Sequence, residues 1–109
     1  MTESTTQIQL KKGALELCVL AMLARGESYA YEIASTLAGR VGMGEGTIYP
    51  LMRRMQDDGL VDTRLIESSS GPPRKYYRLT SAGRTALATQ KREWRTFTDA
   101  VNQLLGEGK

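Results

Sequence analysis

The chain has 109 residues, enough for one domain, and 40% of them are hydrophobic. It has 15 basic and 12 acidic residues, a net charge of +3, no histidine and one cysteine. This composition excludes an internal disulfide and a metal site rich in histidine or cysteine, and it leaves no histidine base for catalysis. We therefore predict a protein that is not an enzyme and needs no cofactor or metal. Because it has no apolar run of roughly 18 residues, we expect a cytoplasmic protein without membrane contact.

Residues 1–10 are polar and rich in threonine, so we expect a flexible N-terminal arm. Residues 14–24 are almost entirely apolar and stop before Gly26, which predicts a helix that is hydrophobic on all sides. Its own domain can cover one side of this helix, and a second subunit can cover the other. Cys18 lies inside the run, where we interpret it as a small buried hydrophobic residue; a redox role is the alternative.

A second helix is expected from Tyr29 to Ala38, with Ser28 as its N-cap and Gly39 as its C-terminal stop. Its buried stripe recurs at helical spacing and consists of Ala30, Ile33, Ala34 and Leu37. A flexible turn of the kind that a helix-turn-helix corner requires is then predicted at Gly42, Gly44 and Gly46.

The third helix has apolar side chains on one face and polar ones on the other. The core face follows the i, i+3, i+4, i+7 pattern through Ile48, Leu51, Met52 and Met55. The opposite face has a size that fits a DNA major groove, about 12 Å wide, and carries Gly46, Pro50, Arg53 and Asp57, with Thr47 and Arg54 flanking them. A surface helix with solvated arginines is the alternative. Because a proline past the first turn removes a backbone hydrogen bond, either the helix begins near Thr47 or its first turn is distorted.

A β-hairpin is predicted after the third helix, with strands over residues 60–66 and 74–79 and a loop over 68–73. Alternation gives the second strand two faces, one with Lys75, Tyr77 and Leu79, the other with Arg74, Tyr76 and Arg78. Every charged residue from 68 to 84 is basic, which favours contact with a polyanion; a solvated hairpin is the alternative. We interpret the hairpin as a wing that contacts DNA phosphates.

A long final helix is predicted from Ser81 or Ala82 to about Leu105, with Thr80 as its N-cap. Its apolar residues form a short heptad stripe that Gln90 interrupts. Little else in so short a chain can cover this helix, so we predict a twofold homodimer that presents two recognition helices to two half-sites. The predicted dimerisation residues are Leu17, Leu87, Trp94, Phe97, Val101, Leu104 and Leu105.

These elements predict a mainly α fold with a small two-stranded β wing. A winged helix-turn-helix domain is expected over residues 11–80 and a dimerisation helix over residues 81–109. A helix with arginines on its outer face, followed by a cationic hairpin, is the arrangement with which such a domain holds duplex DNA.

Three motifs resemble the PadR family of bacterial transcriptional regulators. They are Gly46-Thr47-Ile48-Tyr49-Pro50-Leu51, then Asp58-Gly59-Leu60-Val61, then Gly71-Pro72-Pro73-Arg74-Lys75-Tyr76-Tyr77-Arg78-Leu79-Thr80-Ser81-Ala82-Gly83. The resemblance covers residues 12–105, and the short C-terminal part is similar to the small subfamily with a single C-terminal helix. It implies a homodimeric winged helix-turn-helix regulator, usually a repressor that a small molecule or a stress signal releases from DNA.

The resemblance also implies which residues meet DNA. From the third helix these are Thr47, Tyr49 and Arg53, and from the wing they are Gly71, Arg74 and Lys75. Pro50 and Arg54 lie on the same outer face of the helix, and Tyr76 belongs to the wing motif, so the predicted DNA interface includes them. At least one of Tyr76 and Tyr77 is expected to pack in the fold instead.

Trp94 matches an aromatic residue that small members of the family place near the dimer centre. The resemblance therefore implies a flat apolar pocket between subunits that accepts a small planar apolar effector. Its predicted lining is Leu15, Val19, Trp94 and Phe97. The alternative is that Trp94 anchors the dimer core and binds no ligand.

The sequence thus predicts a DNA-binding transcriptional regulator that binds a pseudo-palindromic operator as a dimer. The same fold also serves as a protein-interaction module that makes no sequence-specific DNA contact, and this function stays open. Salt dependence separates the two, because binding that neutralises phosphates weakens steeply as salt rises. The sequence specifies neither the operator, the regulated genes nor the sign of regulation.

Overall fold

The computed structural model describes residues 10–11 and 13–107. Of the predicted N-terminal arm, residues 1–9 lie outside the described residues, as do residues 108–109 of the predicted dimerisation segment. The elements in chain order are α2 (Leu15–Ala24), β1 (Ser28–Tyr29), α3 (Ala30–Val41), α4 (Glu45–Asp57), β2 (Val61–Ser68), β3 (Gly71–Leu79) and α5 (Ser81–Leu105). In this described part, no helix is long and apolar enough to cross a membrane.

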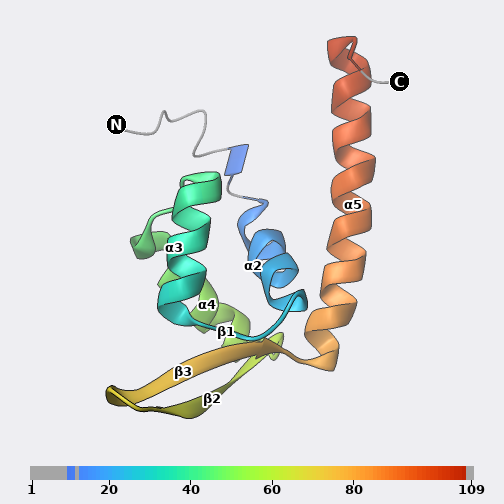
Figure 1. Ribbon diagram of the computed structural model, residues 1–109. Coiled ribbons are helices and arrows are strands. Elements are labelled where there is room, and N and C mark those ends of the chain that lie inside the picture. The colour runs from blue at the N-terminus through green and yellow to red at the C-terminus, as the bar shows by residue number, and fades with distance from the viewer. Residues whose placement is uncertain (1–9, 12, 108–109) are drawn as a thin grey trace.

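The helices α2, α3 and α4 pack together over a small antiparallel sheet with the strand order β1–β3–β2 (Figure 1). The proximal half of α5 lies along α2, whereas its distal half, residues 91–105, extends past the domain. The N-terminal end of α4 and the tip of the β2–β3 hairpin lie on the same side of the molecule, on the left in Figure 1. The α5 helix lies on the opposite side.

One hydrophobic core joins α2, α3, α4 and the sheet. Its largest fully buried side chains are Leu20, Ile33, Ile48, Met52, Met55 and Val19. Tyr77 and Leu79 close the core from the sheet, as the predicted alternation requires. Met43, in the turn between α3 and α4, is only 4% exposed, so a buried side chain anchors the turn that we expect to be flexible.

The predicted limits of the second helix are wrong at both ends. Ser28 is not the N-cap: it lies in β1, and its hydroxyl donates a hydrogen bond to Glu32 Oε1 at 2.5 Å. The helix continues past Gly39 to Val41, whose side chain packs on the core. It ends at Gly42, which has a φ of 67°. Glycine adopts this left-handed conformation without steric cost, so Gly42 is the C-cap.

The predicted two-stranded hairpin is present as β2 and β3, and a third strand that was not predicted extends it to a three-stranded sheet. The additional strand, β1, has two residues and pairs antiparallel with β3, with Ser28 opposite Tyr77 and Tyr29 opposite Tyr76. So short a strand has no periodicity that a sequence could reveal. The connection between α2 and α3 is thereby hydrogen-bonded to the wing.

Both hairpin strands extend further toward the tip than predicted. The segment predicted as a loop, residues 68–73, pairs Ser68 with Gly71 and leaves only residues 69–70 as the turn. A register shift between Ile66 and Ser68 lies opposite Pro72 and Pro73. Because proline cannot donate a ladder hydrogen bond, an irregularity in the pairing at this point lets the strand include both prolines.

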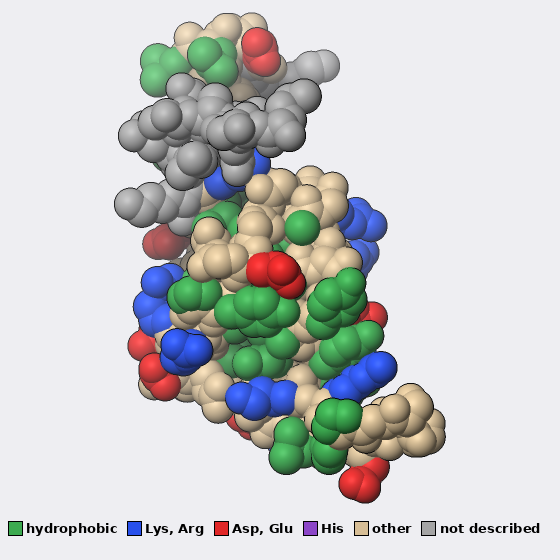
Figure 2. Space-filling model, turned by 90° about the vertical axis from the view of Figure 1, so that its left-hand side faces the viewer, with side chains coloured by type: hydrophobic (Ala, Val, Ile, Leu, Met, Phe, Trp, Pro, Cys, Tyr) green, Lys and Arg blue, Asp and Glu red, His purple; other side chains and the backbone are tan. Residues whose placement is uncertain are grey.

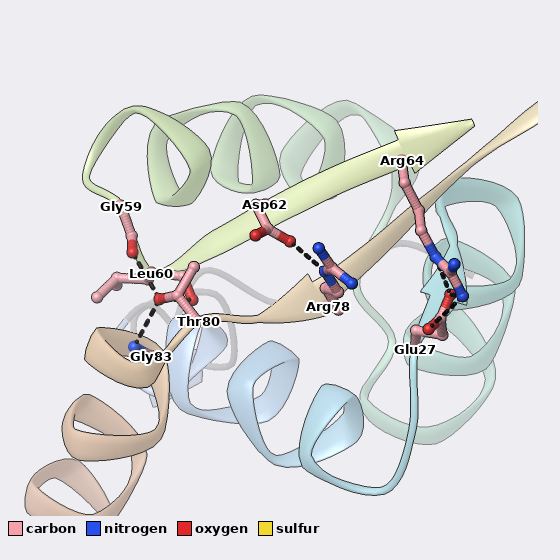
Figure 3. A network of polar contacts seen from close by, with 8 residues as sticks. All are labelled: Glu27, Gly59, Leu60, Asp62, Arg64, Arg78, Thr80 and Gly83. Carbon is pink, nitrogen blue, oxygen red and sulfur yellow. Dashed lines mark hydrogen bonds and ion pairs between the residues drawn. The ribbon is translucent and has the colours of Figure 1, made fainter.

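Thr80 joins α5 to the turn that follows α4. It is the N-cap, as predicted: its hydroxyl oxygen accepts from the Gly83 N–H at 3.0 Å, and the hydroxyl donates to the Gly59 carbonyl at 2.7 Å (Figure 3). The Thr80 N–H donates to the Leu60 carbonyl at 3.1 Å. Gly83 packs so closely that a Cβ there would lie 2.1 Å from the Leu60 oxygen. The base of α5 is therefore fixed to the end of the α4–β2 turn.

Candidate nucleic-acid interface

The outer face of α4 is exposed along its length. Thr47, Pro50, Arg53 and Arg54 are all exposed, as the helical spacing predicts. Tyr49 differs from them because it is half-buried and packs against the core. The helix therefore offers a polar threonine and two guanidinium groups to a groove, with Tyr49 at the edge of this face.

Pro50 lies in the second turn of α4, because the helix begins at Glu45 and not at Thr47. The Gly44 carbonyl accepts from both the Thr47 and the Ile48 N–H groups, at 3.0 and 3.1 Å, so the first turn is tightened. Pro50 has no N–H to donate to the Gly46 carbonyl. Gly46 is exposed, which leaves this carbonyl open to water or to another donor.

The inner face of the wing lies next to the outer side of α4. Burial raises the pKa of Tyr77, and the positive charge of Arg53 opposes that rise. Arg53 of α4 therefore lies close enough to act on the phenol of β3. On the same strand, Lys75 Nζ is 6.0 Å from the centroid of the Tyr77 ring. Arg53 of α4 and Lys75 of the wing thus both lie near the same buried tyrosine.

The outer face of the wing carries an aromatic cluster. The rings of Tyr29 and Tyr76, which are opposite one another in the sheet, have centroids 5.4 Å apart and an interplanar angle of 57°. The guanidinium of Arg74 lies over the Tyr29 ring, with Cζ 4.6 Å from its centroid. Tyr76 is half-buried in this cluster, so it packs in the fold at the same time as it borders the wing surface.

Two other arginines of the wing are paired with carboxylates. Arg64 makes hydrogen bonds to both carboxylate oxygens of Glu27, the shortest at 2.7 Å, and Arg78 Nε lies 2.7 Å from Asp62 Oδ1 (Figure 3). The hydrogen bond and the charge of Asp62 raise the pKa of Arg78. The purely basic stretch seen in the sequence thus meets an acid from the opposite strand. The uncompensated cations of the hairpin strands are reduced to Arg74 and Lys75 in the part of the chain that the structure describes.

Figure 2 shows the side of the molecule from which the end of α4 and the hairpin tip project. Lysine and arginine side chains border a hydrophobic patch on this side, and some of them lie between the patch and the hairpin at the bottom of the view. Cations beside the hairpin can meet the phosphates on either side of a groove.

The family model described as "Transcriptional regulator PadR-like family" matches residues 19–89. The chain belongs to this family. A crystal structure of a PadR-like regulator from Bacillus cereus is 41% identical, with a TM-score of 0.81, over 93% of this chain and 99% of that one. Transcriptional regulator Rv3488 of Mycobacterium tuberculosis is 32% identical over 102 residues, 90% of this chain and 89% of the relative. PadR of Bacillus subtilis, solved in complex with operator DNA, is 26% identical over 71% of this chain and 46% of its own, with a TM-score of 0.64.

The predicted dimerisation residues of this PadR-like protein fall into two groups. Leu87 packs on the core of its own domain, and Leu17 is half-buried. The others lie on the distal half of α5, where Val101 is half-buried and the exposed side chains are Trp94, Phe97, Leu104 and Leu105. The exposed group is available for a second chain, whereas Leu87 already serves the protomer.

The four predicted effector residues do not meet in one pocket of the protomer. Val19 is 0% exposed and belongs to the core of the protomer. The predicted pocket lies between subunits, so the place of Val19 in its lining stays a prediction. Leu15 lines an open cavity of about 640 Å³ together with Pro50, Arg54 and Gln90. Phe97 lines a separate depression on α5. Trp94 and Phe97 share only the exposed stripe of the distal helix.

Sequence reasoning missed the residues that hold the wing in place. Tyr29, Glu27 and Arg64 come from the α2–α3 connection and from β2, and none stands out in a linear pattern. Their roles depend on the pairing of β1 with β3, which brings segments distant in the sequence together. The only hint in the sequence was that Tyr29 lies outside the predicted buried stripe of the second helix.

Proposed function

We propose that this PadR-like protein is a repressor that binds a pseudo-palindromic operator in the cytoplasm as a homodimer. In this proposal α4 enters the major groove, with Thr47, Tyr49, Pro50, Arg53 and Arg54 toward the DNA. The wing follows the phosphate backbone through Gly71, Arg74, Lys75 and the edge of Tyr76. DNA recognition by a recognition helix together with a wing is a known use of this fold.

The observation that carries the proposal is the surface shared by α4 and the wing around Tyr77. Arg53 and Lys75 lie near this tyrosine. Arg54 lies elsewhere on α4, and Arg74 projects from the opposite face of β3. None of these four cations has a carboxylate partner among the residues that the structure describes. A dimer brings together about eight such charges, which corresponds to a log–log slope of affinity against salt of roughly −7 if each neutralises one phosphate. A protein-binding surface gives a weaker salt dependence.

The distal half of α5 supports the homodimer. Its large apolar side chains lie along one stripe, and the described part of the protomer does not bury them. The same stripe on a second copy is a self-complementary partner, since a twofold axis pairs identical surfaces. Two α4 helices in such a dimer can meet half-sites one helical turn apart, about 34–36 Å.

We further propose that a small planar apolar effector controls DNA binding from the subunit contact. Trp94 and Phe97, 43% and 64% exposed, would supply the aromatic surface. Stacking of a flat ligand on these rings would compete with their packing in the dimer and so alter the arrangement of the two α5 helices.

The test is fluorescence anisotropy with a labelled duplex from upstream of the protein's own gene, titrated at several salt concentrations beside a scrambled duplex. We expect tighter binding to the upstream duplex and a steep decrease of affinity with salt for both. Equal and weak binding to the two duplexes would contradict this operator, and no binding at low salt would overturn the proposal of DNA binding.

Substitutions then locate the surface. Lys75→Ala should weaken binding to all duplexes to a similar degree and lower the salt slope by about one for each protomer, because a phosphate contact carries no sequence information. Arg92→Ala is the matched control: it removes an exposed cation from α5, away from the wing, and should leave affinity unchanged. A Lys75→Ala variant that changed sequence preference with little loss of affinity would show that the wing reads bases.

A further inference from the structure

The outer face of the wing carries three arginines, and one of them differs in its surroundings. Arg64 and Arg78 each lie 2.7 Å from a carboxylate oxygen. Arg74 has no such partner in the described part of the chain and lies over the ring of Tyr29 instead, 4.6 Å from its centroid. Of these three guanidinium groups, only that of Arg74 is held in place without being neutralised.

Tyr29 is itself held in a defined position. It lies in β1, opposite Tyr76 of β3, and the two rings are 5.4 Å apart. Arg74 precedes Tyr76 by two residues and therefore projects from the same face of β3. Pairing of β1 with β3 covers only Tyr76 and Tyr77, so Arg74 is the first cation beyond the three-stranded part of the sheet. The ring of Tyr29 reaches past the end of its own strand pairing to support this side chain.

The chemistry of the two kinds of partner explains why the difference matters. A carboxylate that holds an arginine cancels its charge, whereas an aromatic ring attracts the cation through its quadrupole and leaves the net charge intact. A guanidinium stacked on a ring also keeps the N–H groups at its edge free, and these can bind a phosphate in bidentate geometry. Because the side chain is already ordered, it loses less conformational freedom when DNA binds.

We propose that Tyr29 is a positioning residue for DNA binding, which holds the guanidinium of Arg74, with its charge uncompensated, for contact with a backbone phosphate. The proposal rests on the proposed function, since it needs a wing that meets DNA. Tyr29 lies outside both the recognition helix and the hairpin. It acts through Arg74 and makes no DNA contact of its own.

The experiment is a double-substitution cycle with the full-length protein, measured by anisotropy on a mixed-sequence duplex at low salt. The four proteins are the natural chain, Tyr29→Leu, Arg74→Ala and the combination. We expect Tyr29→Leu to lower affinity about tenfold, because the dimer loses roughly threefold at each of two wings. In the Arg74→Ala background the same change should have no effect. An equal loss in both backgrounds would overturn the proposal, because Tyr29 would then act through the fold.

Two matched controls separate positioning from folding. Tyr29→Phe keeps the ring and should retain the affinity of the natural chain. Lys75→Ala lies on the other face of β3, beside Tyr77, so its effect should add to that of Tyr29→Leu with no coupling. Coupling of Tyr29 to Lys75 as strong as to Arg74 would contradict the assignment.

A second measurement holds even if Tyr29→Leu does not fold. Phenylalanines with increasing fluorine substitution at position 29 keep the size and shape of the ring while weakening its attraction for a cation. Affinity for the duplex should fall stepwise with fluorination, and a flat series would overturn the proposal. Failure of the DNA function itself has a different signature: Arg74→Ala would then leave both affinity and salt slope unchanged.

Discussion

The α5 helix has one apolar stripe along its length, yet its two halves have different surroundings. In the proximal half, Ala86 and Leu87 pack on the domain core, and Gln90 Nε2 donates to Glu16 Oε2 of α2 at 2.7 Å. In the distal half no described residue is buried, and Leu104 is 89% exposed. Gln90, which interrupts the stripe in the sequence, marks the point where the protomer stops covering its own helix.

The difference shows which parts of the protein are complete in one chain. The core of the winged domain is covered by α2 and the proximal half of α5, so it is buried within a single protomer. A run of large apolar side chains left exposed on one side of a helix is unusual for a monomer and typical of an interaction surface. If the distal stripe is the contact of the proposed dimer, folding and assembly depend on separate segments of the same helix, and substitutions in each half should have separable effects.

The largest effect is expected at the base of the proximal half. Gly83→Ala would place a Cβ 2.1 Å from the Leu60 carbonyl oxygen, and the backbone must move to admit it. We expect the free energy of unfolding to fall by about 3 kcal/mol, as measured by urea denaturation. Gly39→Ala is the control, because its Cβ would meet nothing within 4 Å inside a helix and should increase stability by up to about 1 kcal/mol. If Gly83→Ala had the same free energy of unfolding as the natural chain, the contact between Gly83 and Leu60 would not be tightly packed.

The distal half is tested by a charge on the stripe. Val101→Glu should weaken dimerisation about a hundredfold, equivalent to about 2.7 kcal/mol, because the carboxylate would have to be buried without a partner. Analytical ultracentrifugation should show monomers, and tight operator binding should be lost. Gln103→Glu places the same charge on the opposite side of the helix and should leave the assembly intact. A Val101→Glu protein that stayed dimeric would remove the distal stripe from the interface.

A smaller change in the proximal half sharpens the contrast. Leu87→Ala removes part of a half-buried side chain that packs on the core, so we expect unfolding to become easier by about 1–2 kcal/mol. The dissociation constant of the dimer should stay within about threefold of its natural value, equivalent to roughly 0.7 kcal/mol. A strong effect of Leu87→Ala on dimerisation with none on unfolding would show that the proximal half of α5 serves the dimer and not the fold of the protomer.

The smallest effect concerns pH. Burial raises the pKa of Tyr77 above its ordinary value of 10.0, so the fold favours the protonated phenol. This contribution to stability is fully present below the unfolded-state pKa of about 10 and is lost as pH rises through the higher folded-state pKa. Between the unfolded-state pKa of about 10 and the higher folded-state pKa, the free energy of unfolding should therefore fall more steeply in the natural chain than in Tyr77→Phe. The monomeric Val101→Glu variant should show the same loss, because Tyr77 belongs to the self-contained domain.

Local patterns were sufficient to predict most of the helical framework. The stripe through Ile48 and Met55 predicted the core face of α4, and Thr80 was recognisable as an N-cap, because both depend on residues within a few positions in the chain. The alternation likewise placed Tyr77 and Arg78 on different faces of β3, although it did not predict which of the two faces is buried. These interactions are short-range, so a single sequence contains the information.

Features that depend on distant segments were not predictable in the same way. The two-residue strand β1 exists only because β3 is beside it, and the pairing of Arg64 with Glu27 depends on that placement. The end of α3 shows a competition that sequence alone does not resolve, since both Gly39 and Gly42 are candidate stops. The packing of Val41 on the core favours the later one. The contact between Tyr29 and Arg74 also depends on the pairing of β1 with β3, and the sequence did not predict it.

The close contacts between Thr80, Gly83 and Leu60 connect α5 rigidly to the turn after α4, so a movement of α5 would also move the recognition helix. With 25 residues the helix is about 37 Å long, so a tilt of roughly 5° at its distal end displaces the base by about 3 Å. Because Gly83 leaves no free space at the base, such a tilt would not be absorbed there and would carry the end of α4 with it. In the proposed dimer, a small angular change at the subunit contact would thus produce a larger change in the distance between the two α4 recognition helices. The proposed response to an effector would then depend on the length and stiffness of α5, with no requirement for the winged domain to change its own shape.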